Sequence, residues 1–209
     1  MGDGISTTPA LGDESLHARL RRHTASLHQR LDAAPPLRAL LRPGLGQYTY
    51  AAILQRFASA YAELEPPLLA METQRPASLA AYRQRLPALQ VELSHLPRVP
   101  TPAVPVTLLL PHEADMEAAH YLGMRYVLDG STQGARVIAG RLAQHLTTPL
   151  AGQFAFWQRQ REAAEEWPSL LAHLADLPVS GRQADAMLAA ATAVFTVFIA
   201  AFAAEKSPS

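Results

Sequence analysis

The chain has 209 residues, of which 49% are hydrophobic and 17% charged, so we expect one domain with a buried core. Its 18 basic residues balance its 18 acidic residues, whereas a protein that binds nucleic acid or an anionic membrane would carry a basic excess. The absence of cysteine excludes disulfides, iron–sulfur clusters, thiolate metal ligands and cysteine nucleophiles. Since the start does not resemble a signal peptide, a cytoplasmic location is expected, with no nucleic-acid or membrane partner.

Almost every periodic stretch has helical spacing, which predicts an all-α fold. Residues 1–13 are expected to form a flexible tail, and residues 14–206 a single helical domain. The predicted helical segments are 15–33, ended by Pro35-Pro36; 37–41; 48–64, ended by Pro66-Pro67; 77–96, with a kink or break at Pro87; 113–146; 154–167; and 186–204. The proline-rich segment 97–111 is expected to be a loop inside the domain.

The segment 186–204 carries no charge and is long enough to cross a bilayer. However, about half of it is alanine, Thr192 and Thr196 interrupt it, and no basic cluster flanks it. A helix that is apolar all round is also what the centre of a helical domain requires. We therefore expect a core helix rather than a membrane span.

The first predicted helix carries a histidine with polar neighbours on its face. Residues three, four or seven apart share a helical face, so His28 shares its face with Arg21, Thr24 and Asp32. Asp32 lies one turn beyond His28, where a carboxylate can hold the ring nitrogen that does not bind a metal. His23, five residues back, points elsewhere. The spacing fits a metal ligand, but taken alone it favours a partly buried histidine bonded to Asp32.

The long segment 113–146 carries Gly123, Gly130 and Gly134 on one face, because they are spaced by seven and four residues. Each glycine inside a helix costs roughly 1 kcal/mol against alanine. A close contact on this face would offset the cost. The contact is made either by a tightly crossing helix or by a flat ligand, and the periodicity does not distinguish the two.

Together these segments resemble the haem oxygenase family in its bacterial, biliverdin-producing form. The resemblance depends on His23-Thr-Ala-Ser-Leu-His-Gln-Arg-Leu31 and on Gly123-Met-Arg-Tyr-Val-Leu-Asp-Gly-Ser-Thr-Gln-Gly134. Residues 85–96 and 191–198 are similar to weaker family patterns, and the likeness spans residues 16–202.

The resemblance implies a helical bundle with haem between the first helix and a bent, glycine-containing distal helix. His28 falls on the iron ligand of the family, and Asp32 on an acidic residue that often follows it. The catalytic part of the family's distal helix, which covers the haem, corresponds to Gly130, Ser131 and Gly134. Haem b is then both substrate and cofactor, and dioxygen cleaves it to biliverdin, carbon monoxide and ferrous iron.

The resemblance also implies partners. Electrons come from a separate donor, which is a ferredoxin, a flavodoxin or a reductase, and the bilin can pass to a photoreceptor. A histidine ligand donates less electron density to iron than a thiolate does.

The chain departs from the family at several positions. Ser131 and Ala135 stand where other branches carry an aspartate and a second glycine, so the distal water network must differ. No basic pair near the C-terminus matches the propionate partners of some members. The predicted substitutes for haem binding are Arg21, which lies about 10 Å from His28 along the helix, Thr24, Tyr121, Arg125 and Tyr126.

Two other functions fit parts of the sequence. A carrier that stores or delivers haem without turnover would share His28 and the glycine face. A di-iron carboxylate site could use two Glu-x-x-His units, since that spacing places both side chains on one helical face. These units are Glu92 with His95 and Glu117 with His120, and Glu63 or Glu65 could supply a further ligand.

Overall fold

The computed structural model describes residues 15–100, 107–110, 113–145, 154–178 and 180–203. All regular structure in these residues is helical, which confirms the predicted class. The α-helices are α1 (Leu16–Asp32), α2 (Pro35–Ala39), α3 (Gln47–Ala70), α4 (Leu86–Ser94), α5 (Glu117–His145), α6 (Ala155–Ala163), α7 (Trp167–Ala175) and α8 (Arg182–Ala201). Three 3-10 turns, Glu72–Gln74, Ala114–Met116 and Ala164–Glu166, precede or connect them. The predicted tail 1–13 lies outside the described residues.

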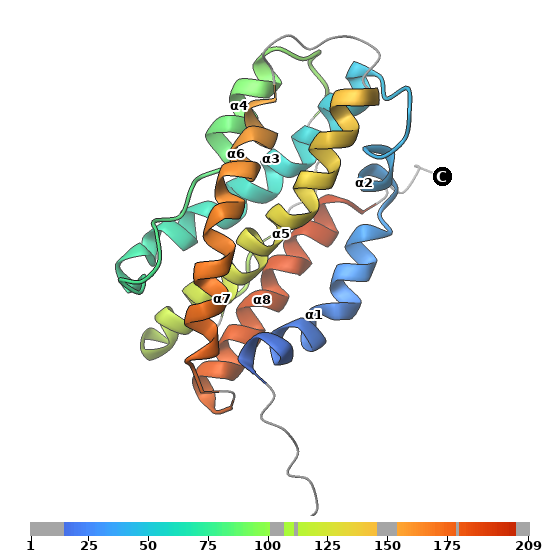
Figure 1. Cartoon of the computed structure of the whole chain (residues 1–209). Coiled ribbons are helices and arrows are strands. Elements are labelled where there is room, and N and C mark those ends of the chain that lie inside the picture. Colours follow the sequence, from blue (N-terminus) through green and yellow to red (C-terminus); the bar gives the residue numbers. More distant parts are fainter. Residues whose placement is uncertain (1–14, 101–106, 111–112, 146–153, 179, 204–209) are drawn as a thin grey trace, which may run out of the picture.

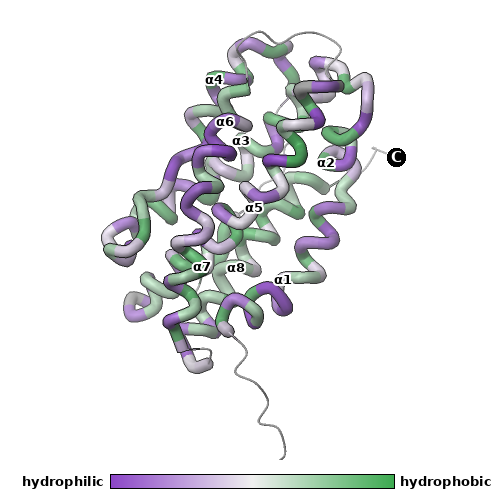
Figure 2. The backbone as a smooth tube through the Cα atoms, in the orientation of Figure 1, coloured by the Kyte–Doolittle hydropathy of each residue, from purple (hydrophilic) through white to green (hydrophobic). Residues whose placement is uncertain are grey.

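Helix α8 organises the bundle. It packs most extensively against α5 and next against α1, and it also contacts α3. Figure 1 shows α5, α8 and α1 side by side, running in a similar direction. In Figure 2 the hydrophobic residues gather along α8, whereas α1 and α6 have hydrophilic stretches. The core therefore runs along α8, and α1 and α5 are both held on it.

The apolar composition of α8 is explained by this central position. Of the described helices, α8 is long and apolar enough to cross a membrane by length and composition, and 56% of its most apolar window is buried inside the protein. Val194 and Ala190 are fully buried and Phe198 nearly so. The burial agrees with the predicted core helix.

Prolines mark helix boundaries differently from the prediction. Pro35 begins α2, and Pro87 lies in the first turn of α4, where a missing N–H costs nothing. Residues 77–85, which were predicted to be helical, are therefore outside the helix. Pro66 and Pro67, predicted to end a helix, lie inside α3, which continues to Ala70. Pro66 is exposed, as is Ala62 one turn before it, so water can reach the carbonyl that Pro66 leaves without a partner.

Two buried glutamates hold the starts of two helices. Glu65 on α3 accepts hydrogen bonds from the backbone N–H groups of Arg85 and Leu86, where α4 begins. Glu92 on α4 accepts one from the backbone N–H of Phe156, at 2.9 Å, where α6 begins. The first N–H groups of a helix lack partners within the helix, so these carboxylates satisfy them. The chain of caps links α3 to α4 and α4 to α6.

Helix α7 was absent from the prediction, which ended its segment at Trp167. In the structure the 3-10 turn Ala164–Glu166 follows α6 directly, and α7 begins at Trp167, with Pro168 in its first turn. Helix α7 contacts both α1 and α5. It thus connects these two helices on one side of the bundle.

Candidate functional site

His28 lies near the end of α1, and its side chain is 64% exposed. Its Nδ1 lies 2.9 Å from Oδ2 of Asp32, as the spacing predicted. With a proton on Nδ1 directed at that carboxylate, the lone pair of Nε2 faces away and is available to a metal. The Phe195 ring of α8 meets the imidazole edge-on, with the centroids 6.0 Å apart. The arrangement fixes the imidazole and leaves one nitrogen available for a ligand role.

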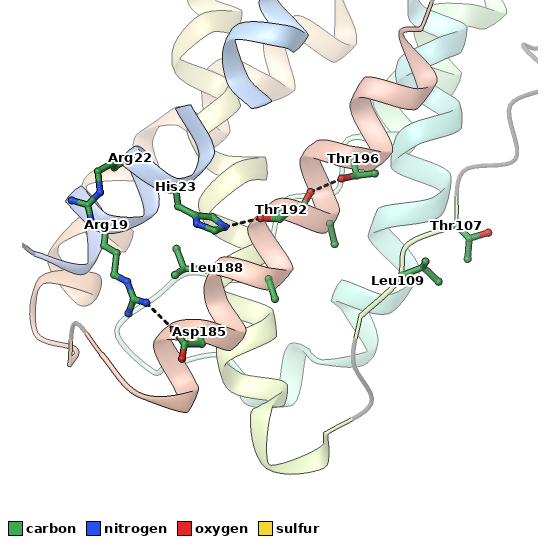
Figure 3. Close-up of a pocket in the computed structure, with 11 residues that line it drawn as sticks. Arg19, Arg22, His23, Thr107, Leu109, Asp185, Leu188, Thr192 and Thr196 are labelled. Carbon is green, nitrogen blue, oxygen red and sulfur yellow. Dashed lines mark hydrogen bonds and ion pairs between the residues drawn. The ribbon is translucent and has the colours of Figure 1, made fainter. Parts of the chain in front are cut away.

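His23 serves a different surface. Its Nε2 lies 3.1 Å from Oγ1 of Thr192 on α8. It lines a groove of about 800 Å³ formed by α1, α8 and residues 107–109, which Figure 3 shows in close-up. The ion pair between Arg19 and Asp185, at 2.7 Å, spans the two helices there. His28 is not among the residues that line this groove, so the two histidines belong to different sites, as predicted.

The three glycines of α5 have three different neighbours. A side chain at Gly123 would overlap the backbone carbonyl of Met187 and lie 2.9 Å from Cβ of Ala190, so α8 crosses there. A Cβ at Gly130 would lie 3.2 Å from the Trp167 ring. A Cβ at Gly134 would meet nothing within 4 Å in the described part of the chain. Helix packing explains Gly123, while the face at Gly134 is open, as a site for a flat ligand requires.

The face around Gly134 is sparsely covered by the described residues. From residue 131 to 142 of α5 the buried side chains are Thr132, Ala135 and Leu142. Val137, one turn beyond Gly134, is 60% exposed although it is a large apolar side chain. An apolar surface left open beside a helix is a common mark of a binding site.

Ser131 places a hydroxyl beside the open face. Its Oγ donates a hydrogen bond to the backbone carbonyl of Leu128, at 2.8 Å. The same hydroxyl lies near that of Tyr61, whose pKa is raised by burial. The side-chain amide of Gln160 donates to the Tyr61 hydroxyl at 3.1 Å. Ser131 supplies no ionisable group at the position where other branches carry aspartate.

Polar groups gather where α1 and α5 meet. Thr24 donates to the carbonyl of Leu20 at 2.9 Å, and its side chain lies close to the Tyr126 hydroxyl. Burial raises the pKa of Tyr126, and Arg21 acts in the opposite direction. Arg21 is exposed and makes no hydrogen bond or ion pair with the described residues. Arg21, Thr24 and Tyr126 thus lie together, and Arg21 is available to an anionic ligand.

Arg125 and Tyr121 lie elsewhere, in a buried network. The Arg125 guanidinium bonds Asp129 at 2.6 Å and the Tyr121 hydroxyl at 2.6 Å. Asp129 also pairs with the fully buried Arg85 at 3.0 Å, and Tyr121 donates to Glu72 at 2.9 Å. Both side chains are satisfied by protein groups, so the geometry gives no support to their predicted contact with a ligand. They hold the first half of α5 instead.

The structure argues against a di-iron site. Both carboxylate oxygens of Glu92 accept from protein donors, the Tyr50 hydroxyl and the Phe156 N–H. His95 is exposed at the end of α4, and Glu63 accepts from the backbone N–H of Leu108. Within the described ranges no group of three or more His, Asp or Glu side chains is placed to hold a metal.

Sequence reasoning missed Trp167 and Phe195 as neighbours of the site. Phe195 lies in a segment that carries a weak family pattern, and Trp167 was predicted only as a helix end. Both reach the site from helices distant in sequence, so spacing within α1 or α5 gave no signal for them.

Known proteins resemble this chain in sequence and in fold. The sequence matches the family described as heme oxygenase over residues 14–204. The heme oxygenase of Xanthomonas campestris pv. campestris (strain 8004) is 34% identical over 161 residues, which cover 77% of this chain and 92% of that protein. The solved heme oxygenase structure from Leptospira interrogans has a TM-score of 0.64 at 19% identity, and the match covers 90% of this chain and 98% of that chain.

Proposed function

This chain belongs to the haem oxygenase family, and on that premise we propose that α1 and α5 hold haem between them, with His28 as the iron ligand. The enzyme degrades haem, which is both its substrate and its cofactor. The observation that carries the residue assignment is the geometry at His28. Nδ1 is held by Asp32, and no described residue occupies Nε2.

The residues present fit the group. Gly134 offers a helix face on which an added Cβ would meet no described atom within 4 Å, and such a face suits a flat macrocycle. Val137 and Phe195 supply apolar surface. Arg21, which has no ion pair with the described residues, supplies a cation for a propionate, with Thr24 and Tyr126 beside it. A cation beside apolar surface matches the amphipathic character of haem.

The chemistry divides between the ligand and the chain. When bound, haem supplies the iron that activates dioxygen and the ring that is opened to biliverdin, carbon monoxide and ferrous iron. Asp32 orients the imidazole of His28 through Nδ1, so that Nε2 would be the nitrogen that holds the iron. The face at Gly134 would let a flat ring approach the backbone, and Ser131 would offer a neutral hydroxyl rather than a proton-donating acid. Proton delivery on the α5 side therefore falls to water.

Several finer assignments belong to the same proposal. The electron donor is a ferredoxin, flavodoxin or reductase of the cytoplasm, where the enzyme itself resides. The catalytic domain comprises residues 14–206. Delivery of the bilin to a photoreceptor follows only from the resemblance, and no described contact bears on it.

Turnover is the direct test. Purified protein is reconstituted with hemin and given a ferredoxin–reductase system in air. We expect the Soret band to disappear and a green pigment to form that co-elutes with biliverdin, together with carbon monoxide. A Soret band that persists under these conditions, while haem stays bound, would instead establish a haem carrier.

A further inference from the structure

Three aromatic rings from three helices meet at the end of the proposed haem site where α1 and α5 come together. They are His17 of α1, Tyr126 of α5 and Trp167 of α7. The ring centroids of Tyr126 and Trp167 are 5.6 Å apart, those of His17 and Tyr126 6.0 Å, and those of His17 and Trp167 6.2 Å. Each ring contacts the other two, so the cluster is closed.

The Trp167 ring lies directly against the glycine face of α5. A Cβ at Gly130 would lie 3.2 Å from Cη2 and 3.4 Å from Cζ3 of the indole. These distances are close for van der Waals contact, so the ring edge covers Gly130. One turn further, about 6 Å along the axis, a Cβ at Gly134 would meet no described atom within 4 Å. On this face of α5, the described residues therefore cover Gly130 and leave Gly134 open.

Helix α1 shows a corresponding change along its length, from a position in contact with α5 to one that is exposed. Thr24 of α1 lies close to the Tyr126 hydroxyl of α5 at that level. His28 lies one turn beyond Thr24 on α1, just as Gly130 lies one turn beyond Tyr126 on α5. A ring system that reaches His28 and Gly134 extends toward Gly130 and meets the indole there.

Trp167 is held in place by more than its ring contacts. It is the first residue of α7, and Pro168 follows it in the first turn, where the fixed φ of proline stiffens the backbone. Helix α7 itself packs on both α1 and α5. The backbone that carries the indole is therefore held in place against both helices.

We propose that Trp167 is the end wall of the haem site, which fixes the in-plane position of the porphyrin and so selects the meso carbon that faces Gly134. The proposal rests on the function proposed above and deepens it. The indole does not take part in the chemistry. Trp167 is a positioning residue, because an apolar ring edge at one end of the site permits only some in-plane orientations of the asymmetric porphyrin.

The test compares Trp167→Ala and Trp167→Phe with the wild type. Leu171→Ala is the matched control, since Leu171 is a half-buried side chain of α7 that makes no ring contact with the cluster. Two readouts are used on the hemin complexes. The hyperfine-shifted haem methyl signals of the ferric complex in proton NMR report in-plane orientation without turnover, and chromatography of the pigment gives the biliverdin isomers.

For Trp167→Ala we expect a second set of methyl signals, and a ratio of major to minor isomer that falls roughly tenfold or more, as for loss of a specific pocket contact. Trp167→Phe, which keeps a ring and is the milder change for folding, should lie between wild type and Trp167→Ala. Leu171→Ala should match the wild type in both readouts.

Unchanged methyl signals and isomer ratios in both Trp167 variants would overturn the end wall, even though the wild type cleaves haem. A second orientation in Leu171→Ala as large as that in Trp167→Ala would also overturn it, because loosening of α7 would then suffice. A wild type that binds hemin without any histidine-ligated spectrum, and forms no bilin, would overturn the proposed function together with the wall.

Discussion

Arg21 and Asp32 flank His28 on one face of α1, two turns before it and one turn after it. Asp32 is paired with the imidazole, whereas Arg21 has no partner in the described part of the chain. The same helix presents Arg30, also exposed, on a different face. These differences assign Asp32 to the imidazole and Arg21 to a carboxylate of the ligand.

Arg21→Ala should weaken hemin binding by roughly 10- to 150-fold, since a hydrogen bond to a charged group contributes about 1.5–3 kcal/mol. Arg30→Ala is the control and should bind like the wild type. The dissociation constants come from equilibrium titration, repeated with haem dimethyl ester. The ester lacks charged carboxylates, so the two variants should bind it alike. An equal loss for the ester in Arg21→Ala would show that Arg21 acts through the fold.

Glu92 gives a second prediction at this scale. Burial raises its pKa to about 7, above the value in an unfolded chain. The folded state therefore holds the proton more tightly, and the stability from this group is present at low pH and lost as pH rises toward and through 7. Glu92→Gln should unfold like the wild type near pH 4.5 and become the more stable protein by up to about 3 kcal/mol near pH 8. Urea denaturation across this range measures the difference, and a constant difference between the two proteins would contradict the assignment.

At the scale of one element, α5 combines packing and binding on one glycine face. Gly123 admits α8, Gly130 admits the Trp167 ring, and Gly134 is open. Gly140, on another face of the same helix, is also open. The cost of glycine in a helix is therefore offset by protein contacts at Gly123 and Gly130, and at Gly134 by the proposed ligand.

Gly134→Ala and Gly140→Ala form a matched pair. Each should raise the free energy of unfolding of the apoprotein by up to about 1 kcal/mol, because alanine is the better helix former and no described neighbour is crowded. Only Gly134→Ala should weaken hemin binding, by roughly tenfold or more, since overpacking of a close contact costs about 1–3 kcal/mol. Thermal unfolding and hemin titration give both values. Full hemin affinity in Gly134→Ala would place the ligand elsewhere.

At the scale of the whole molecule, α8 supports α1 and α5, and the ligand is expected to join their free faces. Hemin should therefore slow amide hydrogen exchange in residues 21–32 and 131–142, where the described side chains are sparsely buried. Exchange in α8 should be slow with or without hemin, because its residues form the core. Mass spectrometry of peptides gives the rates, and slowing confined to the groove that His23 lines would contradict the site.

The helical class, the His28–Asp32 pair and the separate direction of His23 could all be predicted from the sequence, because each depends on spacing within one helix. The rest depends on partners far along the chain. Pro66 and Pro67 obey a local rule for helix ends that α3 overrides. The start of α4 depends on Glu65, about 20 residues earlier in the chain. The sequence predicts a ligand contact for Arg125 because it does not show that Arg85, far along the chain, joins Arg125 on the carboxylate of Asp129.

The most direct measurement is the hemin titration of His28→Ala beside His23→Ala, followed by the optical and electron paramagnetic resonance spectra of the ferric complexes. His23→Ala should bind hemin like the wild type and show the same spectra. His28→Ala should bind more weakly and lose the histidine-ligated spectrum, which added imidazole should restore. If His28→Ala keeps full affinity and an unchanged iron spectrum, iron is held by another group and the assignment of the site to α1 and α5 is wrong.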